Sequence, residues 1–216
     1  MSKYLKSALF GIFRIMAYFS QAVKTLIIHP KDATTDVLKG IYSGINNKTV
    51  INGGIPKLDL RKLIQTHDRI FMLGHGSPWG LLSMGQFPYI NGYIIDDSIA
   101  VELKEKPFNL YIWCHADQFV KRHKLSGLNC GMFISEVSEA FIYGFEDVDR
   151  ATIERSNEIF VHIVSKYINE PMEVLYEKLI YEYGLLARRN PIAGFNLERL
   201  YLNSPASYKS MDKLAG

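Results

Sequence analysis

Three short runs of apolar residues constrain the fold more than any other feature of this chain. They are VKTLIIH at 23–29, RIFML at 69–73 and FNLYIWC at 108–114. Strands that are apolar on both faces are typical of parallel sheets that helices cover on both sides. The stretches between the runs carry apolar residues at helical spacing. We therefore predict an α/β fold, a three-layer α/β/α sandwich with a mostly parallel sheet.

The chain divides into four parts. Residues 1–21 form an apolar, basic N-terminal segment, and residues 22–148 hold the alternating strands and helices of the predicted core. Residues 149–202 keep helical spacing and are expected to pack on the core as a helical C-terminal extension. Residues 203–216 are expected to fray.

Turn and cap residues predict the elements inside the core. Thr34 or Thr35 is expected to cap a helix, and Asp96 or Asp97 a second one that runs to Lys104. Further predicted elements are a helix over 58–66, a hairpin over 79–84 and 89–95, a strand over 131–134 and a helix over 136–143.

The charge of the chain is unevenly placed. Lys and Arg number 25 and Asp and Glu 22, and the net charge of +3 equals that of residues 1–21. Because the rest of the chain is neutral, we expect no nucleic-acid partner. Two cysteines give neither a disulfide framework nor a four-cysteine zinc site, and no phosphate-binding loop follows a strand. We therefore predict no metal, no cofactor and a cytoplasmic location.

Residues 1–21, MSKYLKSALFGIFRIMAYFSQ, leave three interpretations open. The segment is a packed helix or extension, with Met16 as an alternative start. Alternatively it is a helix that lies on a membrane surface, since its apolar runs are too short to span a bilayer. A secretory signal is the third interpretation, although Arg14 interrupts the apolar run.

Two of the predicted strands run into reactive side chains. RIFML leads to Gly74-His75-Gly76, and FNLYIW leads to Cys114-His115. If the two strands are parallel neighbours, His75 and Cys114 emerge at one edge, where an imidazole can take the proton of a thiol that attacks a carbonyl. The amides of Gly76 and Cys114 are the predicted donors to the oxyanion that develops.

These motifs resemble those of the caspase-like cysteine peptidases, the group of caspases, metacaspases, gingipains and clostripain. The matching stretches are IFMLGHGS at 70–77 and NLYIWCHA at 109–116, and the resemblance covers about residues 23–145. It implies a caspase-like fold and a cysteine endopeptidase that cleaves peptide bonds through a thioester acyl-enzyme. Cys114 would be the nucleophile, and His75 the general base and then acid.

The same resemblance suggests where a substrate side chain would bind. Family members use residues just after the first strand, where this chain has Asp32 and Asp36, and a carboxylate there would favour Arg or Lys. Asp32 is equally suited to start a turn after Pro30, and Asp36 to the first turn of a helix. His115, next to the predicted nucleophile, is a further candidate for substrate binding or for the base.

Two other functions remain open at the sequence level. The fold can be a catalytically silent binding or regulatory module, with a protein partner on the C-terminal helices, where YEKLIYEYGLLARR at 176–189 is rich in Tyr and Leu. It can also be a thiol enzyme that is not a protease, such as an acyl transferase or amidase.

Overall fold

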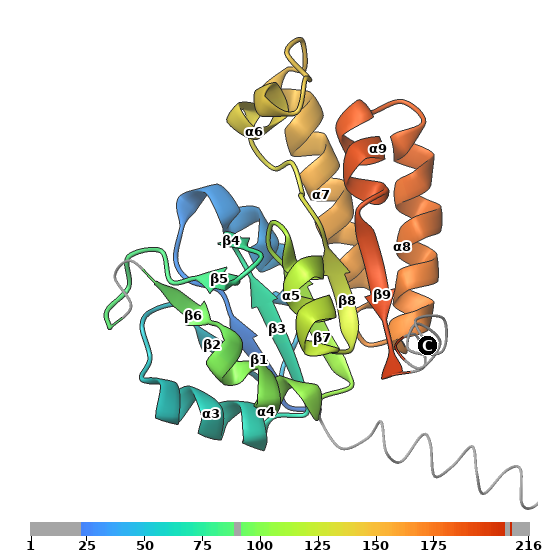
Figure 1. Ribbon diagram of the computed structural model, residues 1–216. Helices are drawn as coiled ribbons and strands as arrows, with labels where there is room; N and C mark the ends of the chain where they lie inside the picture. The colour runs from blue at the N-terminus through green and yellow to red at the C-terminus, as the bar shows by residue number, and fades with distance from the viewer. Residues whose placement is uncertain (1–22, 89–91, 206–207, 209–216) are drawn as a thin grey trace, which may run out of the picture.

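The computed structural model describes residues 23–88, 92–205 and 208, and its centre is a six-stranded sheet (Figure 1). The strand order is β2-β1-β3-β7-β8-β9, in which the first five strands run parallel and β9 is antiparallel to β8. This confirms the predicted α/β fold with a mostly parallel sheet. The strands are β1 (Thr25–Ile28), β2 (Lys48–Ile51), β3 (Arg69–Leu73), β7 (Phe108–Ile112), β8 (Gly127–Cys130) and β9 (Leu200–Asn203).

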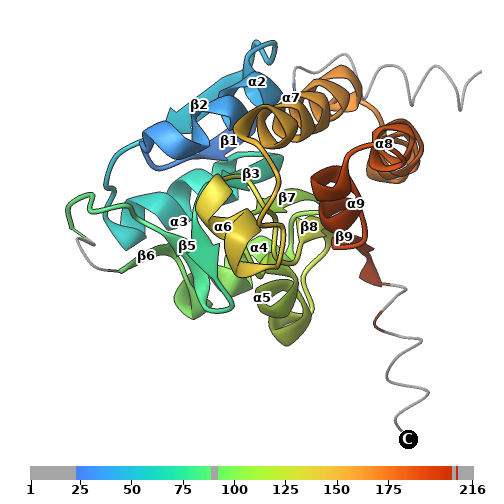
Figure 2. The same ribbon diagram turned by 90° about the horizontal axis from the view of Figure 1, so that it is seen from above.

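Helices cover both faces of the sheet, as Figure 2 shows from above. One face carries α3 (Lys57–Thr66), α4 (Ala100–Lys104) and α5 (Ala116–His123). The opposite face carries the 3₁₀ helix η1 (Ala33–Leu38), α2 (Lys39–Tyr42), α7 (Arg150–Tyr167) and α8 (Met172–Ala187). The short α6 (Val137–Ile142) lies beyond the carboxyl ends of the strands, and α9 (Pro191–Leu197) packs against α8.

Strand β3 shows why the sequence selects this arrangement. Its side chains alternate between the faces, so Ile70 and Met72 join the core under α3 to α5, while Phe71 and Leu73 join the core under α7 and α8. All five residues of β3 are buried. A strand with two apolar faces is stable only between two helical layers.

A small antiparallel sheet follows β3 and confirms the predicted hairpin. It consists of β4 (Gly76–Ser77), β5 (Gly80–Leu82) and β6 (Tyr93–Ile95), in the order β4-β5-β6. After it, Asp96 caps the 3₁₀ helix η2 (Asp97–Ile99) by accepting a hydrogen bond from the Ser98 amide, and α4 continues from there. One of the two predicted caps is thereby confirmed.

The predicted cap of the first helix was wrong. Asp32, rather than Thr34 or Thr35, caps η1 by accepting a hydrogen bond from the Thr34 amide, and the first turns are 3₁₀ rather than α-helical. A short side chain two residues ahead of an amide closes an Asx turn, which competes with threonine capping.

The strand predicted over 131–134 was also wrong. The strand is β8 at Gly127–Cys130, and the apolar residues that follow it form a loop. The side chain of Asn196 on α9 accepts a hydrogen bond from the Ile134 amide at 2.7 Å and donates one to the Ile134 carbonyl at 2.9 Å. The Asn196 side chain therefore forms the two backbone hydrogen bonds of Ile134 that a neighbouring strand would form.

The C-terminal part is helical up to Leu197 and then adds β9 to the sheet, which the helical prediction for residues 149–202 did not include. Interpretations of residues 1–21, and of most of 203–216, lie outside the described residues. Within the part that the structure describes, no helix has both the length and the apolarity needed to cross a membrane.

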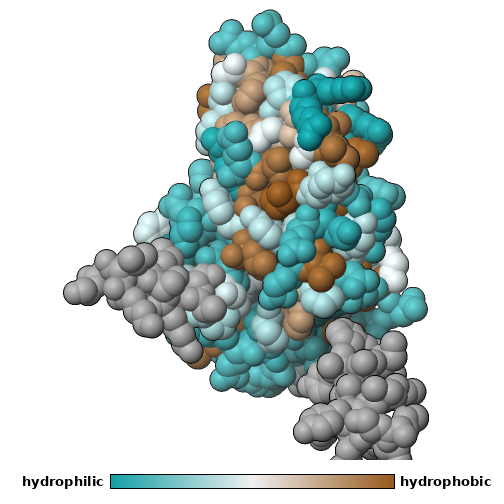
Figure 3. Space-filling model, turned by 90° about the vertical axis from the view of Figure 1, so that its right-hand side faces the viewer, coloured by the Kyte–Doolittle hydropathy of each residue, from teal (hydrophilic) through white to brown (hydrophobic). Residues whose placement is uncertain are grey.

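The exposed face of α8 bears on the partner predicted for the C-terminal helices. Tyr181 and Leu185 are exposed there, and Figure 3 shows apolar side chains among polar ones on this side of the molecule. The partner itself stays a prediction.

Candidate active site

His75 and Cys114 meet at one edge of the sheet because their strands are parallel neighbours. Leu73 of β3 pairs with Ile112 of β7, so the two reactive residues both stand two positions beyond a register pair. The Gly74 amide donates to the Ile112 carbonyl at 3.0 Å and continues the pairing past the end of β3. The order and register of the strands therefore place the imidazole and the thiol at the same edge of the sheet, at matching positions beyond the two strand ends.

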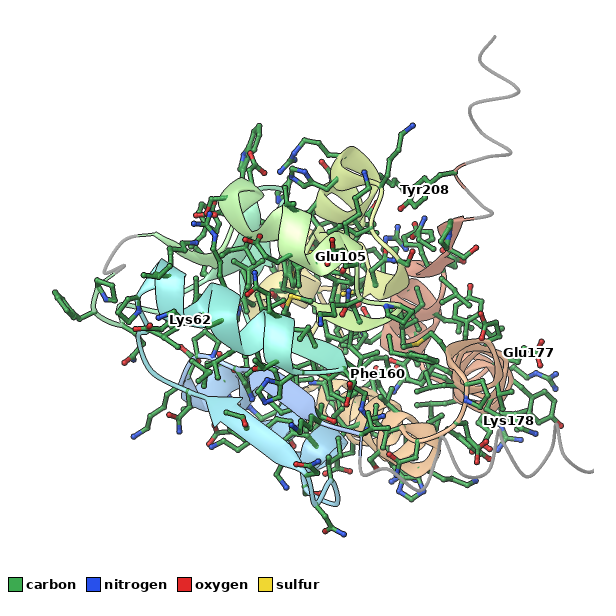
Figure 4. The ribbon with its side chains drawn as sticks, turned by 90° about the horizontal axis from the view of Figure 1, so that it is seen from below. Lys62, Glu105, Phe160, Glu177, Lys178 and Tyr208 are labelled. Carbon is green, nitrogen blue, oxygen red and sulfur yellow. The ribbon has the colours of Figure 1, made fainter. Side chains whose placement is uncertain are left out.

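Both side chains line one pocket, which we call the catalytic pocket. Its walls are mostly apolar, and Phe160 of α7 reaches it from the core between that helix and the sheet (Figure 4). The other lining residues are Thr34, Thr35, Val37, Leu38, Gly74, Ile112, Trp113, Phe133, Ser135 and Asn157.

A threonine and an aspartate orient the imidazole. His75 Nε2 lies 2.7 Å from Thr34 Oγ1, and the Thr34 hydroxyl donates in turn to Asp32 Oδ1. The hydroxyl proton points to the carboxylate, so Oγ1 accepts from Nε2–H, and the lone pair of the neutral ring is on Nδ1. The hydrogen bond from Thr34, more than the nearby imidazole, lowers the pKa of Asp32 below its usual value.

The thiol of Cys114 is held in its protonated form. Its S–H donates to the Phe133 carbonyl at 3.6 Å, and Sγ lies 3.9 Å from Oε1 of Glu139. Burial, and then the Glu139 carboxylate, raise the pKa of Cys114 to about 12. Within the described residues, His75 is not among the hydrogen-bond partners of this thiol, so the two groups share the pocket without an ion pair.

Glu139 is a site residue that the sequence did not reveal. Its Oε2 accepts hydrogen bonds from the amides of Ser135 at 2.7 Å and Glu136 at 3.2 Å. It completes the capping box of α6, and a Glu three residues after a helix start is the sequence signal for that role. Nothing in the sequence indicated that its other oxygen faces Cys114.

Of the two predicted oxyanion donors, Cys114 lines this pocket and Gly76 does not. A Cβ at Gly76 would come within 2.1 Å of Trp113 Cδ1 and 2.6 Å of the Gly80 carbonyl oxygen, so only glycine fits there. The backbone amide of Cys114 has no acceptor among the described residues. His115 follows with φ of 65°, and this left-handed residue turns the chain into α5.

The three predicted substrate-binding residues are not in the lining of this pocket. Asp32 accepts hydrogen bonds from Thr34 and caps η1. Asp36 forms an ion pair with Lys39 at 2.6 Å. His115 is the residue that precedes α5. Their role in substrate binding stays a prediction. Within the described part of the chain, no three His, Cys, Asp or Glu side chains gather to hold a metal ion.

Comparison of the chain with protein-family models, curated proteins and solved structures finds no match. The function is therefore inferred from the site itself.

Proposed function

We propose that this chain is a cysteine endopeptidase in which Cys114 is the nucleophile and His75 the proton carrier, as the caspase-like motifs imply. One observation carries the proposal: the thiol and the imidazole follow neighbouring parallel strands and line one pocket. An imidazole and a thiol that converge on one cavity are the minimum for nucleophilic attack on a carbonyl.

In the proposed reaction the proton of Cys114 moves to His75 Nδ1 as Sγ bonds to the peptide carbonyl carbon. The amides of Gly76 and Cys114 donate to the resulting oxyanion. His75 then gives its proton to the leaving amine as the C–N bond breaks, which leaves a thioester. Water, deprotonated by His75, attacks the thioester and releases the acid and the Cys114 thiol.

The Thr34 contact supports the assignment of His75 as the base. With Nε2–H donated to Thr34 and the Thr34 hydroxyl donated to Asp32, the lone pair of Nδ1 is free to accept a proton. After proton transfer, the imidazolium lies 3.9 Å from the Asp32 carboxylate. The same arrangement that orients the ring would therefore stabilise its charged form.

The test is cleavage of a diverse peptide library, read by mass spectrometry. Cys114→Ala and His75→Ala are each expected to abolish the cleavage seen with the wild-type protein. Cys130→Ala is the matched control, because this second thiol is fully buried and donates to the Trp113 carbonyl. Cleavage that survives either active-site substitution would contradict the proposal.

A catalytically silent module is the second candidate. The observation that favours it is the protonated resting thiol, which donates to Phe133 and lies beside Glu139 rather than His75. A silent module predicts no cleavage of any peptide by the wild-type chain, and alkylation of Cys114 that His75→Ala leaves unchanged.

A further inference from the structure

The short helix α6 carries its large apolar side chains on the outside. Val137, Phe141 and Ile142 are 45%, 63% and 76% exposed, whereas Ala140 is fully buried. The helix lies at the outer end of the molecule, beyond the carboxyl ends of the strands (Figure 1). A surface helix normally turns its apolar side chains toward the core, so the arrangement in α6 is inverted.

The inner side of α6 shows what takes the place of these apolar residues. Glu139 accepts hydrogen bonds from the backbone amides that precede the helix and faces the Cys114 thiol. Ala140 packs in a small apolar cluster with Ile134, Ile153 and Ile192. A carboxylate and a methyl group therefore occupy the inward positions, and the larger apolar side chains of α6 remain in contact with solvent.

The exposed residues form one surface, which we call the α6 patch (Val137, Phe141 and Ile142). Val137 and Phe141 are four residues apart and so share a face of the helix, and Ile142 is the next residue along the chain. Exposed apolar patches that polar residues surround are typical of interaction sites.

The chain around the α6 patch is acidic. Glu154 and Glu158 of α7 line one hollow together with Val137. Over residues 143–158, all of which the structure describes, two arginines face five exposed carboxylates, and these are Glu146, Asp147, Asp149, Glu154 and Glu158. The α6 patch therefore has a negatively charged rim.

This charge selects among the partners that an apolar patch can have. An anionic peptide or an anionic membrane surface would be repelled by the rim, and a second copy of this chain would bring the same carboxylates to the contact. A segment with an apolar row between basic side chains would cover the patch and neutralise the rim. A helix presents such a row along one side, at the spacing that Val137 and Phe141 themselves have.

We propose that the α6 patch is the docking site for an amphipathic helix of a partner protein, apolar on one side and basic on its flanks. Phe141 and Ile142 contact the apolar side, and the carboxylates of Glu146 and Asp147 attract the flanks. The inference goes beyond the proposed function and does not depend on it, because docking breaks no bond.

The test measures binding of a labelled synthetic peptide to the chain by fluorescence anisotropy. The probe contains only leucine and lysine, in the order that makes a helix amphipathic, and a leucine and glutamate peptide of the same order is its counterpart of opposite charge. The Cys114→Ala chain is used, so that a lysine peptide stays intact whether or not the wild-type chain is a peptidase. The lysine peptide is expected to bind more tightly than the glutamate peptide, and more weakly as salt is added.

Two double variants locate the binding site. Phe141→Ser with Ile142→Ser removes two large apolar contacts and should weaken binding of the lysine peptide by at least about tenfold. Glu146→Gln with Asp147→Asn should weaken it by about threefold or more and reduce its salt dependence. All four side chains are exposed, so none of these changes opens a cavity and the variants are expected to fold.

The matched control is Tyr181→Ser with Leu185→Ser. These two residues form an exposed apolar pair on the same outer side of α8 as Glu177 and Lys178, where charges of both signs are present (Figure 4). The control should leave the affinity for the lysine peptide unchanged, because the α6 patch and its rim are intact.

Several results would overturn the inference. They are equal affinity for the two peptides, no binding of either peptide, and an affinity for the lysine peptide that Phe141→Ser with Ile142→Ser does not change. A free chain that sediments as a dimer, and that the same double variant converts to a monomer, would assign the α6 patch to a second copy instead. Docking in a chain whose wild-type form cleaves no peptide would refute the peptidase and leave the docking site, whereas cleavage without docking would do the reverse.

Discussion

The Glu139 carboxylate beside Cys114 gives a sharp quantitative prediction. With the pKa of Cys114 raised to about 12, only about one thiol in ten thousand is ionised at pH 8. An ordinary thiol with a pKa near 8.5 is about one quarter ionised there. Alkylation of Cys114 by iodoacetamide in the resting protein should therefore be slower on the order of a thousandfold than that of an exposed cysteine.

Glu139→Gln should raise the ionised fraction of the Cys114 thiol and so restore part of its reactivity. The carboxylate oxygen is 3.9 Å from Sγ, and a unit charge at such a distance is worth about 1 to 4 kcal/mol between the dielectric of water and that of a protein surface. The pKa of Cys114 should fall, and alkylation at pH 8 should rise by at least about fivefold. Glutamine keeps an oxygen for the Ser135 and Glu136 amides, so the α6 cap is retained.

The assay follows alkylation of Cys114 and Cys130 separately, by peptide mass, between pH 6 and pH 10. Cys130 is an internal control, because it is fully buried and should stay unreactive in the folded chain. Glu177→Gln is the matched control for loss of a carboxylate. If Glu139→Gln folds and alkylates at the wild-type rate, the electrostatic account of the resting thiol is refuted.

Three further predictions follow from contacts around the pocket. Thr34→Val removes the partner of the His75 imidazole. If the proposed peptidase activity is present, this change should lower kcat by about tenfold or more and shift its pH profile, whereas Thr34→Ser should restore both. Gly76→Ala forces a Cβ against Trp113 and should cost about 1 to 3 kcal/mol in a urea unfolding measurement. Asn196→Leu leaves the Ile134 amide and carbonyl unpaired and should cost about 2 kcal/mol or more in the same measurement.

The meeting of His75 and Cys114 was predictable because it depends on strand order alone. Two apolar strands with helical connections become parallel neighbours, and the residues after them then share an edge. The structure confirms that they share a pocket. Their electrostatic state was not predictable in this way, because Glu139 reaches Cys114 from another part of the chain.

The rest of the site depends on long-range packing that local patterns do not encode. In the sequence, Asn157 is one polar residue in a stretch with helical spacing. Its position in the pocket lining depends on how α7 packs against the sheet. The strand placed over 131–134 failed for a related reason. Its apolar residues resemble a strand, but a side chain of α9 satisfies the backbone of Ile134.

The antiparallel strand β9 has a consequence for how the protein is made. It pairs with β8, and the chain that follows β8 places Phe133 and Glu139 in contact with the Cys114 thiol. The preceding α9 supplies Asn196, which accepts a hydrogen bond from the Ile134 amide. During synthesis from the N-terminus, His75 and Cys114 are present long before these last contacts form. A growing chain that stops before Leu200 would leave the edge of β8 unpaired and open to other strands. The chain after β8, which contains Phe133 of the pocket wall, would then lack the neighbouring strand β9. The site is therefore finished only when nearly the whole described chain has emerged.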